Sequence, residues 1–126
     1  MPIYTLPGPV IPAGEFVSNA VDCGGHQILR IVTPDGWDKA SLTFQLSPDN
    51  SKFNDLYHVE PTVDGFVPYE VIVPWIPDGA TLAMPPSTGL KIFWIRFRSG
   101  TKAAPVVQSN DRMFQIVMWV PDAAGG

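Results

Sequence analysis

The side chains best suited to bind a metal ion lie in two separate parts of the chain. Cys23-Gly24-Gly25-His26 offers a thiol and an imidazole, and His58 could add a third ligand. Asp22 and Asp55 are near these residues in the sequence. Zinc sites built from such residues show paired ligands at both ends, which this chain lacks. A turn beside a small buried thiol explains the segment more simply, so we predict no metal and no cofactor.

Aspartates are frequent enough to raise the question of calcium binding. No segment resembles the calcium loop, with its alternating oxygen ligands, glycine and closing glutamate. Most of the aspartates stand beside Pro, Gly or Asn, where a carboxylate closes a turn by bonding to nearby backbone. The residues concerned are Asp35, Asp38, Asp49, Asp55, Asp64 and Asp78. We therefore expect structural turns.

One segment is similar to the serine-nucleophile motif of subtilisin-like proteases. It runs from Gly100 to Pro105, but Lys102 stands at the nucleophile position and cannot perform acyl transfer there. The Asp and His motifs of those proteases are absent, and the chain is too short for their fold. No G-x-S-x-G elbow or phosphate-binding glycine loop is present, and Glu15, Glu60 and Glu70 are scattered. The sequence predicts a protein that is not an enzyme.

Four tryptophans are the remaining candidates for binding, because aromatic rings stack on sugars. The alternative is that they belong to the core. Trp94 and Trp119 have apolar neighbours within expected strands, which favours the core or an interface. Trp75 lies in a proline-bounded loop and is the best candidate for an exposed contact.

Composition narrows the function classes further. Charged residues make up 16% of the 126 residues, against about 25% in typical soluble domains, while hydrophobic residues make up 45%. This favours an oligomer or an assembly component with covered surface, although a plain monomer is compatible with it. A net charge of −4 argues against nucleic-acid binding, and no apolar run is long enough to span a membrane. The N-terminus lacks signal-peptide features, so we expect synthesis in the cytoplasm.

The elements that would position these residues are strands. The 14 prolines leave few windows for a helix, and the segments between them alternate with period two. Four segments are clear candidates and two are weaker: 27–33, 41–47, 91–98 and 113–120, then 52–59 and 67–73. Turn signals separate them. We predict an all-β, single-domain β-sandwich or jelly roll of six to eight strands.

Alternation also predicts which side chains share a face. Leu42, Phe44 and Leu46 are expected on one face of their strand. In the segment 27–33, Leu29 and Ile31 are expected on one face and Ile28 on the other. In the segment 91–98, Phe93, Ile95 and Phe97 are expected to share a face. The segment 113–120 is apolar on both faces apart from Gln115, as expected for a central strand.

The two ends differ from the middle. Residues 1–13 are extended and proline-spaced, and we interpret them as an arm laid on a neighbour or, alternatively, as an edge strand of the chain's own sheet. Residues 14–121 would form the sandwich and 122–126 a flexible tail. The predicted partner contacts are Ile3, Tyr4 and Leu6 of the arm and Trp75.

Three stretches resemble a group of small structural proteins of tailed bacteriophages. They are IPAGEFVSNAVDCGG, LTFQLSPDNSKFNDLY (preceded by Trp37) and FRSGTKAAPVVQSNDRMFQIV. The resemblance covers about residues 11–120. Asp49-Asn50 replaces the usual Asp-Gly turn, a change that still suits a tight hairpin. Asp111 and Arg112 of the last motif are expected either to hold a loop through charge-assisted hydrogen bonds or to be exposed.

The resemblance implies a virion component, with a capsid decoration (cement) protein as the main interpretation. Such a protein would bind the major capsid protein on the capsid surface and stabilise the shell, and it would form a homo-oligomer, with a trimer favoured. A tail, baseplate or head-tail connector subunit is the first alternative. A carbohydrate-binding adhesion module is the second.

Overall fold

The computed structural model describes residues 3–85 and 91–120, and these residues form nine strands and no helix. The strands are β1 (Ile3–Ile11), β2 (Val21–Val32), β3 (Leu42–Ser47), β4 (Asn54–Asp55), β5 (Tyr57–Thr62), β6 (Gly65–Glu70), β7 (Thr81–Ala83), β8 (Ile92–Ser99) and β9 (Arg112–Trp119). The all-β prediction is confirmed. The number of strands exceeds the predicted six to eight, because strands as short as β4 and β7 cannot show alternation. The predicted tail, 122–126, lies outside the described residues.

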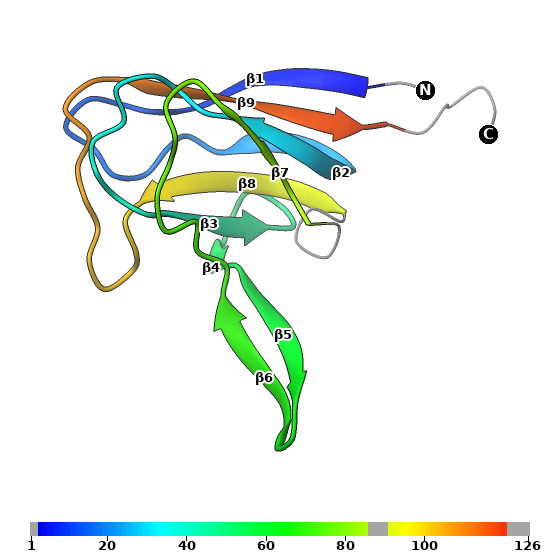
Figure 1. The fold of residues 1–126 in the computed structure, drawn as a ribbon. Coiled ribbons are helices and arrows are strands. Elements are labelled where there is room, and N and C mark those ends of the chain that lie inside the picture. Colours follow the sequence, from blue (N-terminus) through cyan, green and yellow to red (C-terminus); the bar gives the residue numbers. More distant parts are fainter. Residues whose placement is uncertain (1–2, 86–90, 121–126) are drawn as a thin grey trace.

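Seven strands form one continuous antiparallel sheet, which folds into two packed layers (Figure 1). Its order is β1-β9-β2-β8-β3-β4, and β7 pairs with β2. Strand β2 belongs to both layers: its first half pairs with β8, and its second half pairs with β9 and β7. This arrangement confirms the β-sandwich, while the jelly-roll variant stays a prediction. No helix in the described ranges is long and apolar enough to cross a membrane.

The bend in β2 depends on two glycines. Gly24 and Gly25 both have positive φ, and the register with β8 shifts between Asp22 and His26. A Cβ on Gly25 would lie 2.8 Å from a ring carbon of Phe93. On β8, Ile95 and Phe97 are buried, whereas Phe93, which alternation predicts on the same face, is exposed.

Aromatic rings join the two layers through the centre of the core. Phe97 of β8 packs edge-on against Phe44 of β3 and Phe114 of β9, with ring centroids 5.1 and 5.0 Å apart. Trp37 packs on Phe114 at 5.6 Å. Leu42 and Phe44 are buried and Leu46 packs against the core, which confirms the predicted face of β3. Such edge-to-face pairs add about 0.5–1.5 kcal/mol each beyond their buried area.

A second bulge changes the predicted faces of β2. The register with β9 shifts between Ile28 and Arg30, so Ile28 and Ile31 are both buried while Leu29 is only partly buried. The prediction that Leu29 and Ile31 share one face of the strand is therefore wrong, because one extra residue in a strand reverses the faces of the residues that follow it. Strand β9 lies between β1 and β2, as predicted for a central strand.

The N-terminal segment is an edge strand. Its residues pair with β9 from Ile3↔Trp119 to Ile11↔Arg112, with one irregularity between Pro7 and Val10. Ile11 is fully buried, and Leu6 packs against the core. Of the two interpretations of residues 1–13, the described part of this segment therefore matches the edge strand and not a separate arm.

Candidate protein interface

The hairpin of β5 and β6 stands away from the sandwich (Figure 1). Its strands pair from Tyr57↔Glu70 to Thr62↔Gly65, which leaves a two-residue loop at the tip. The Thr62 hydroxyl donates to the Gly65 carbonyl at 2.9 Å and accepts from the Asp64 amide at 3.2 Å. Gly65 has a φ of 109°, a value that side chains disfavour. The turn is therefore determined by local sequence.

One face of the hairpin is apolar and open to solvent. Directly opposed residues of an antiparallel pair point to the same side, and alternate pairs share that side. The register thus gathers five exposed residues, which we call the apolar hairpin face: Tyr57, Val59, Pro61, Phe66 and Pro68. Phe66 is 76% exposed, and Val63 at the tip is fully exposed. No part of this face contributes to the core.

The opposite face of the hairpin is more polar. It carries His58, Glu60, Thr62 and Tyr69, together with the half-buried Val67. The His58 imidazole Nδ1 lies 3.6 Å from a Glu60 carboxylate oxygen, and its ring is 6.0 Å from that of Tyr69. The hairpin is therefore amphipathic, with its apolar side unpartnered within the described chain.

A single guanidinium holds both ends of the hairpin. Arg98 Nη1 lies 3.0 Å from Asp55 Oδ1, just before β5, and Nη2 lies 3.1 Å from Glu70 Oε2, at the end of β6. Arg98 Nε donates to the Thr43 hydroxyl at 3.0 Å, which in turn donates to the Gly100 carbonyl. The Arg98 side chain is only 5% exposed. We call this arrangement the Arg98 clamp.

Backbone hydrogen bonds connect the same ends of the hairpin to β3. The Leu56 amide donates to the Phe44 carbonyl at 2.9 Å, and the Val71 amide donates to the Leu56 carbonyl at 3.0 Å. The backbone amides of Leu42 and Val73 each donate a hydrogen bond to the carbonyl of the other residue. A two-stranded hairpin is marginal in water by itself, so these bonds and the clamp fix its direction.

A depression of about 610 Å³ lies at the base of the hairpin. Its apolar lining includes Val71, Val73, Leu82 and Met84, and its polar lining includes Glu60 and Glu70. The depression adjoins the polar side of the hairpin, because His58 and Glu60 line it and no residue of the apolar hairpin face does.

The structure does not gather the predicted contact residues into one site. Ile3 and Tyr4 are exposed on β1, while Leu6 is half-buried against the core. Trp75 is 69% exposed and lines a depression of about 560 Å³ with Trp37 and Lys39. Tyr4 and Leu6 line a different depression, which shares no residue with that of Trp75. Their roles as contacts stay predictions.

The candidate metal ligands do not cluster in the part of the chain that the structure describes, where no three His, Cys, Asp or Glu side chains meet. Cys23 is buried, and this burial, together with the Asp22 carboxylate, raises the pKa of its thiol to about 12. A thiol with that pKa is a poor nucleophile and a poor metal ligand at neutral pH.

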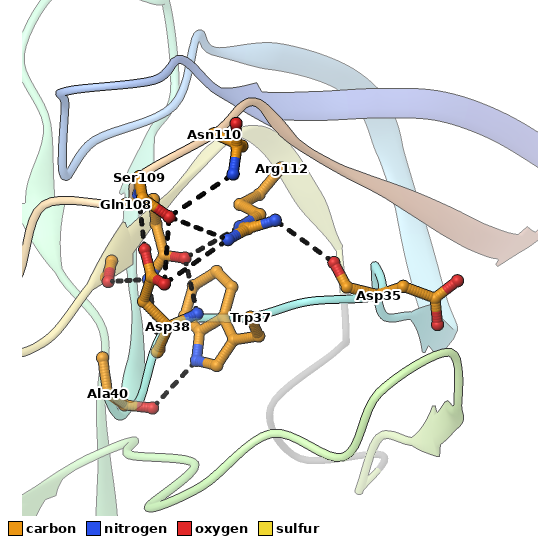
Figure 2. A network of polar contacts seen from close by, with 9 residues as sticks. Asp35, Trp37, Asp38, Ala40, Gln108, Ser109, Asn110 and Arg112 are labelled. Carbon is orange, nitrogen blue, oxygen red and sulfur yellow. Dashed lines mark hydrogen bonds and ion pairs between the residues drawn. The ribbon is translucent and has the colours of Figure 1, made fainter.

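Arg112 joins two loops at one end of the sandwich (Figure 2). Its Nε donates to Gln108 Oε1 at 3.0 Å, Nη1 donates to the Asp35 carbonyl at 3.3 Å, and Nη2 lies 3.5 Å from Asp38 Oδ1. Asp111 Oδ1 accepts from the Ala13 amide at 2.8 Å. Arg112 is buried and connects the loops, which confirms the loop-holding interpretation for this residue, whereas Asp111 is exposed and also accepts one backbone hydrogen bond.

Asp38 completes this network from the other loop. Its carboxylate accepts the backbone N–H and the hydroxyl of Ser109. These bonds, with a smaller contribution from Arg112, hold the pKa of Asp38 below its usual value. The Gln108 amide also donates to Ser99 and to the Asp38 carbonyl. The network is a structural connection between residues 35–38 and 108–112.

The protease-like segment forms a tight loop. Gly100 bridges to Pro105, and Thr101 and Ala104 exchange backbone hydrogen bonds of 3.2 Å. Gly100 has a φ of 88°, and a Cβ there would lie 2.4 Å from the Ala104 carbonyl oxygen. Lys102 is exposed. The glycine is required by the loop.

Sequence reasoning missed the hairpin as a functional element. Its two weaker strand candidates, 52–59 and 67–73, overlap β5 and β6 only in part. The available signal was Asp64-Gly65 between two alternating runs, a strong hairpin pattern.

Comparison of the chain with family models, with curated proteins and with solved structures gives no match in any of the three.

Proposed function

We propose that this chain is a structural protein of a tailed-bacteriophage virion, and specifically a capsid cement protein that binds the major capsid protein and stabilises the shell. It would act as a homo-oligomer, with a trimer favoured, on the capsid surface. The observation that carries the proposal is the apolar hairpin face, which is fixed to the sandwich by the Arg98 clamp and contributes nothing to its core.

Exposed apolar surface of this kind supports a binding function. Contiguous apolar patches on soluble proteins mark interaction sites, because their hydration is unfavourable unless a partner covers them. The Arg98 clamp supports the same interpretation, since a hairpin held in one direction loses less conformational entropy when it binds. The virion assignment itself rests on the motif resemblance.

The decisive test is the number of copies of this chain in purified virions, measured by quantitative mass spectrometry against the major capsid protein. Near parity with that protein is expected for a cement protein. About a dozen copies per particle would instead assign the protein to the tail, baseplate or connector. Absence from the particle would overturn the virion proposal.

Trp75 favours carbohydrate binding as a second candidate function. It is 69% exposed beside a depression that Lys39 and Ser41 also line. Sugar-dependent quenching of tryptophan fluorescence that is lost in Trp75→Ala would support this role. A lack of response across a broad glycan panel would exclude it.

A further inference from the structure

We infer that a second copy of this chain packs face to face on the sheet formed by β1, β9 and β2, through a contact to which both copies contribute the same residues. The inference rests on the homo-oligomer in the proposed function and names the surface that joins its copies. Because such a contact joins copies in pairs, it predicts a dimer, whereas the resemblance favours a trimer, and the measured mass distinguishes the two.

The strand register defines the residues of this surface. Phe114, Ile116 and Met118 of β9 are buried in the core, so the alternate residues of β9 and the residues paired with them point away from the core. We call this set the outer sheet face: Ile3, Thr5, Pro7 and Val10 of β1, Met113, Gln115, Val117 and Trp119 of β9, and Gln27, Arg30 and Val32 of β2. All of them are exposed or partly buried. The three strands lie side by side (Figure 1), so these residues form one continuous surface.

The outer sheet face is nearly free of charge. Arg30, on its β2 side, is the only charged residue of the set, which includes no Asp or Glu. The outer surface of the other layer differs, because Arg96 and Arg98 of β8 donate there to Gln45 and Thr43 of β3. Strand β9 carries apolar side chains on both sides apart from Gln115, a pattern typical of strands that are covered on both sides. The outer sheet face therefore has the composition of a surface that becomes buried.

The polar groups of the face favour a second copy as the occupant. The Gln115 side-chain amide carries both donors and an acceptor, so it can bond to the same amide of another copy. Within residues 3–85 and 91–120, the side chains of Gln27, Arg30 and Gln115 make no hydrogen bond or ion pair, so all three can still take partners. Stable interfaces between identical subunits are also more apolar and poorer in charge than interfaces with transient partners. A partner selected by charge would find only Arg30 to recognise.

The geometry of sheet packing allows this contact without repulsion between the two arginines. Sheets twist in one hand, so two equal sheets pack face to face with their strands about 30° apart and about 10 Å between the sheets. With a two-fold axis along β9, Gln115 lies over Gln115 of the second copy, and Arg30 lies over Thr5, because both residues are level with Val117. The two Arg30 residues are then two strand spacings apart, roughly 10 Å, and on opposite sides of the interface. This separation exceeds the screening length of about 8 Å at physiological salt.

The test measures the mass of the purified chain by analytical ultracentrifugation over a range of concentrations. The wild type should form a dimer that dissociates on dilution. Gln115→Glu and Gln115→Lys should each weaken the dimer at least about tenfold, because each places like charges opposite one another. An equimolar mixture of the two variants should restore the dimer, since each charge then faces its opposite. Asn54→Asp is the matched control, because it makes the same change of amide to acid at an exposed position of β4, outside the outer sheet face.

Several results would overturn the contact: a wild type that stays monomeric or forms a trimer, a dimer that both Gln115 variants leave unchanged, or a mixture that stays monomeric. The variants alter an exposed side chain and should unfold like the wild type, and Met113→Glu, at a position 51% exposed, repeats the test elsewhere on the face. The number of copies in virions tests the proposed function separately. A dimer of a chain that is absent from virions keeps the contact and removes the proposed function, whereas a monomer found at parity with the major capsid protein does the reverse.

Discussion

Removal of the Arg98 guanidinium tests how the hairpin is held. Arg98 is 5% exposed, and its partners Asp55 and Glu70 are 14% and 16% exposed, so solvent screens these ion pairs weakly. Arg98→Met leaves two nearly buried carboxylates without a cation, although Gln45 Nε2 still donates to Asp55 Oδ1 at 3.1 Å. A buried ion pair broken on one side costs about 3–5 kcal/mol. This is a large share of a total stability of about 5–15 kcal/mol. For a chain of this length, the expected fall in Tm is roughly 10–20 °C.

The assay combines equilibrium urea unfolding with native-state hydrogen exchange. Arg98→Met should lower the free energy of unfolding and should increase exchange in β5 and β6 more than in β9. The triple variant Arg98→Met, Asp55→Asn, Glu70→Gln should recover more than half of the loss, because no unpaired charge remains. Arg96→Met is a milder comparison: Arg96 stacks over Phe53 at 4.4 Å and its Nε donates to Gln45, a neighbour of Asp55, so its loss should cost about 1–2 kcal/mol.

Two results would refute this account of the clamp. The first is a loss below about 1 kcal/mol in Arg98→Met, which would place the ion pairs among weak surface contacts. The second is a triple variant as unstable as Arg98→Met, which would assign the loss to packing of the arginine side chain and not to the unpaired carboxylates.

Three shorter predictions concern other parts of the sandwich. Cys23, with its pKa of about 12, should react with iodoacetamide at pH 8 far more slowly in the folded chain than in urea, and mass spectrometry checks this. The lowered pKa of Asp38 means that its contribution to stability is present above the unfolded pKa of about 4 and is lost as pH falls through the folded pKa. Asp38→Asn should therefore flatten the acid limb of stability against pH, and an unchanged slope would contradict this. Gly100→Ala should cost about 1–3 kcal/mol by thermal unfolding, because it combines a positive φ with a clash at the Ala104 carbonyl.

The sequence predicted the strands whose alternation is uninterrupted. β3 and β9 match the predicted segments 41–47 and 113–120 to within a residue, and the buried Leu42 and Phe44 lie on the predicted face. Predictions failed where a strand contains an irregularity. Leu29 was placed on the wrong face because one extra residue in β2 reverses the pattern, and periodicity alone does not reveal such a residue.

Long-range polar contacts were beyond sequence reasoning for a different reason. Arg98 meets Glu70 across 28 residues, and Arg112 meets the Asp35 carbonyl across 77. Nothing local in the sequence indicates such partners, since each depends on the order of strands in the sheet. The motif resemblance drew attention to Arg112, whereas nothing in the sequence distinguishes Arg98 from the other residues of the segment 91–98.

The hairpin shows where the apolar surface implied by the low charge content of the chain lies. A composition with 16% charged residues predicted apolar surface that something covers. The apolar hairpin face supplies such surface, in a pair of strands that gives nothing to the core and is held by a buried arginine. A hairpin needed only for folding would bury its apolar side chains, and a flexible one would not need a clamp at both ends. The combination of exposed Phe66 with buried Arg98 is therefore best explained by a binding element that is ordered before its partner arrives, which reduces the entropy lost on docking.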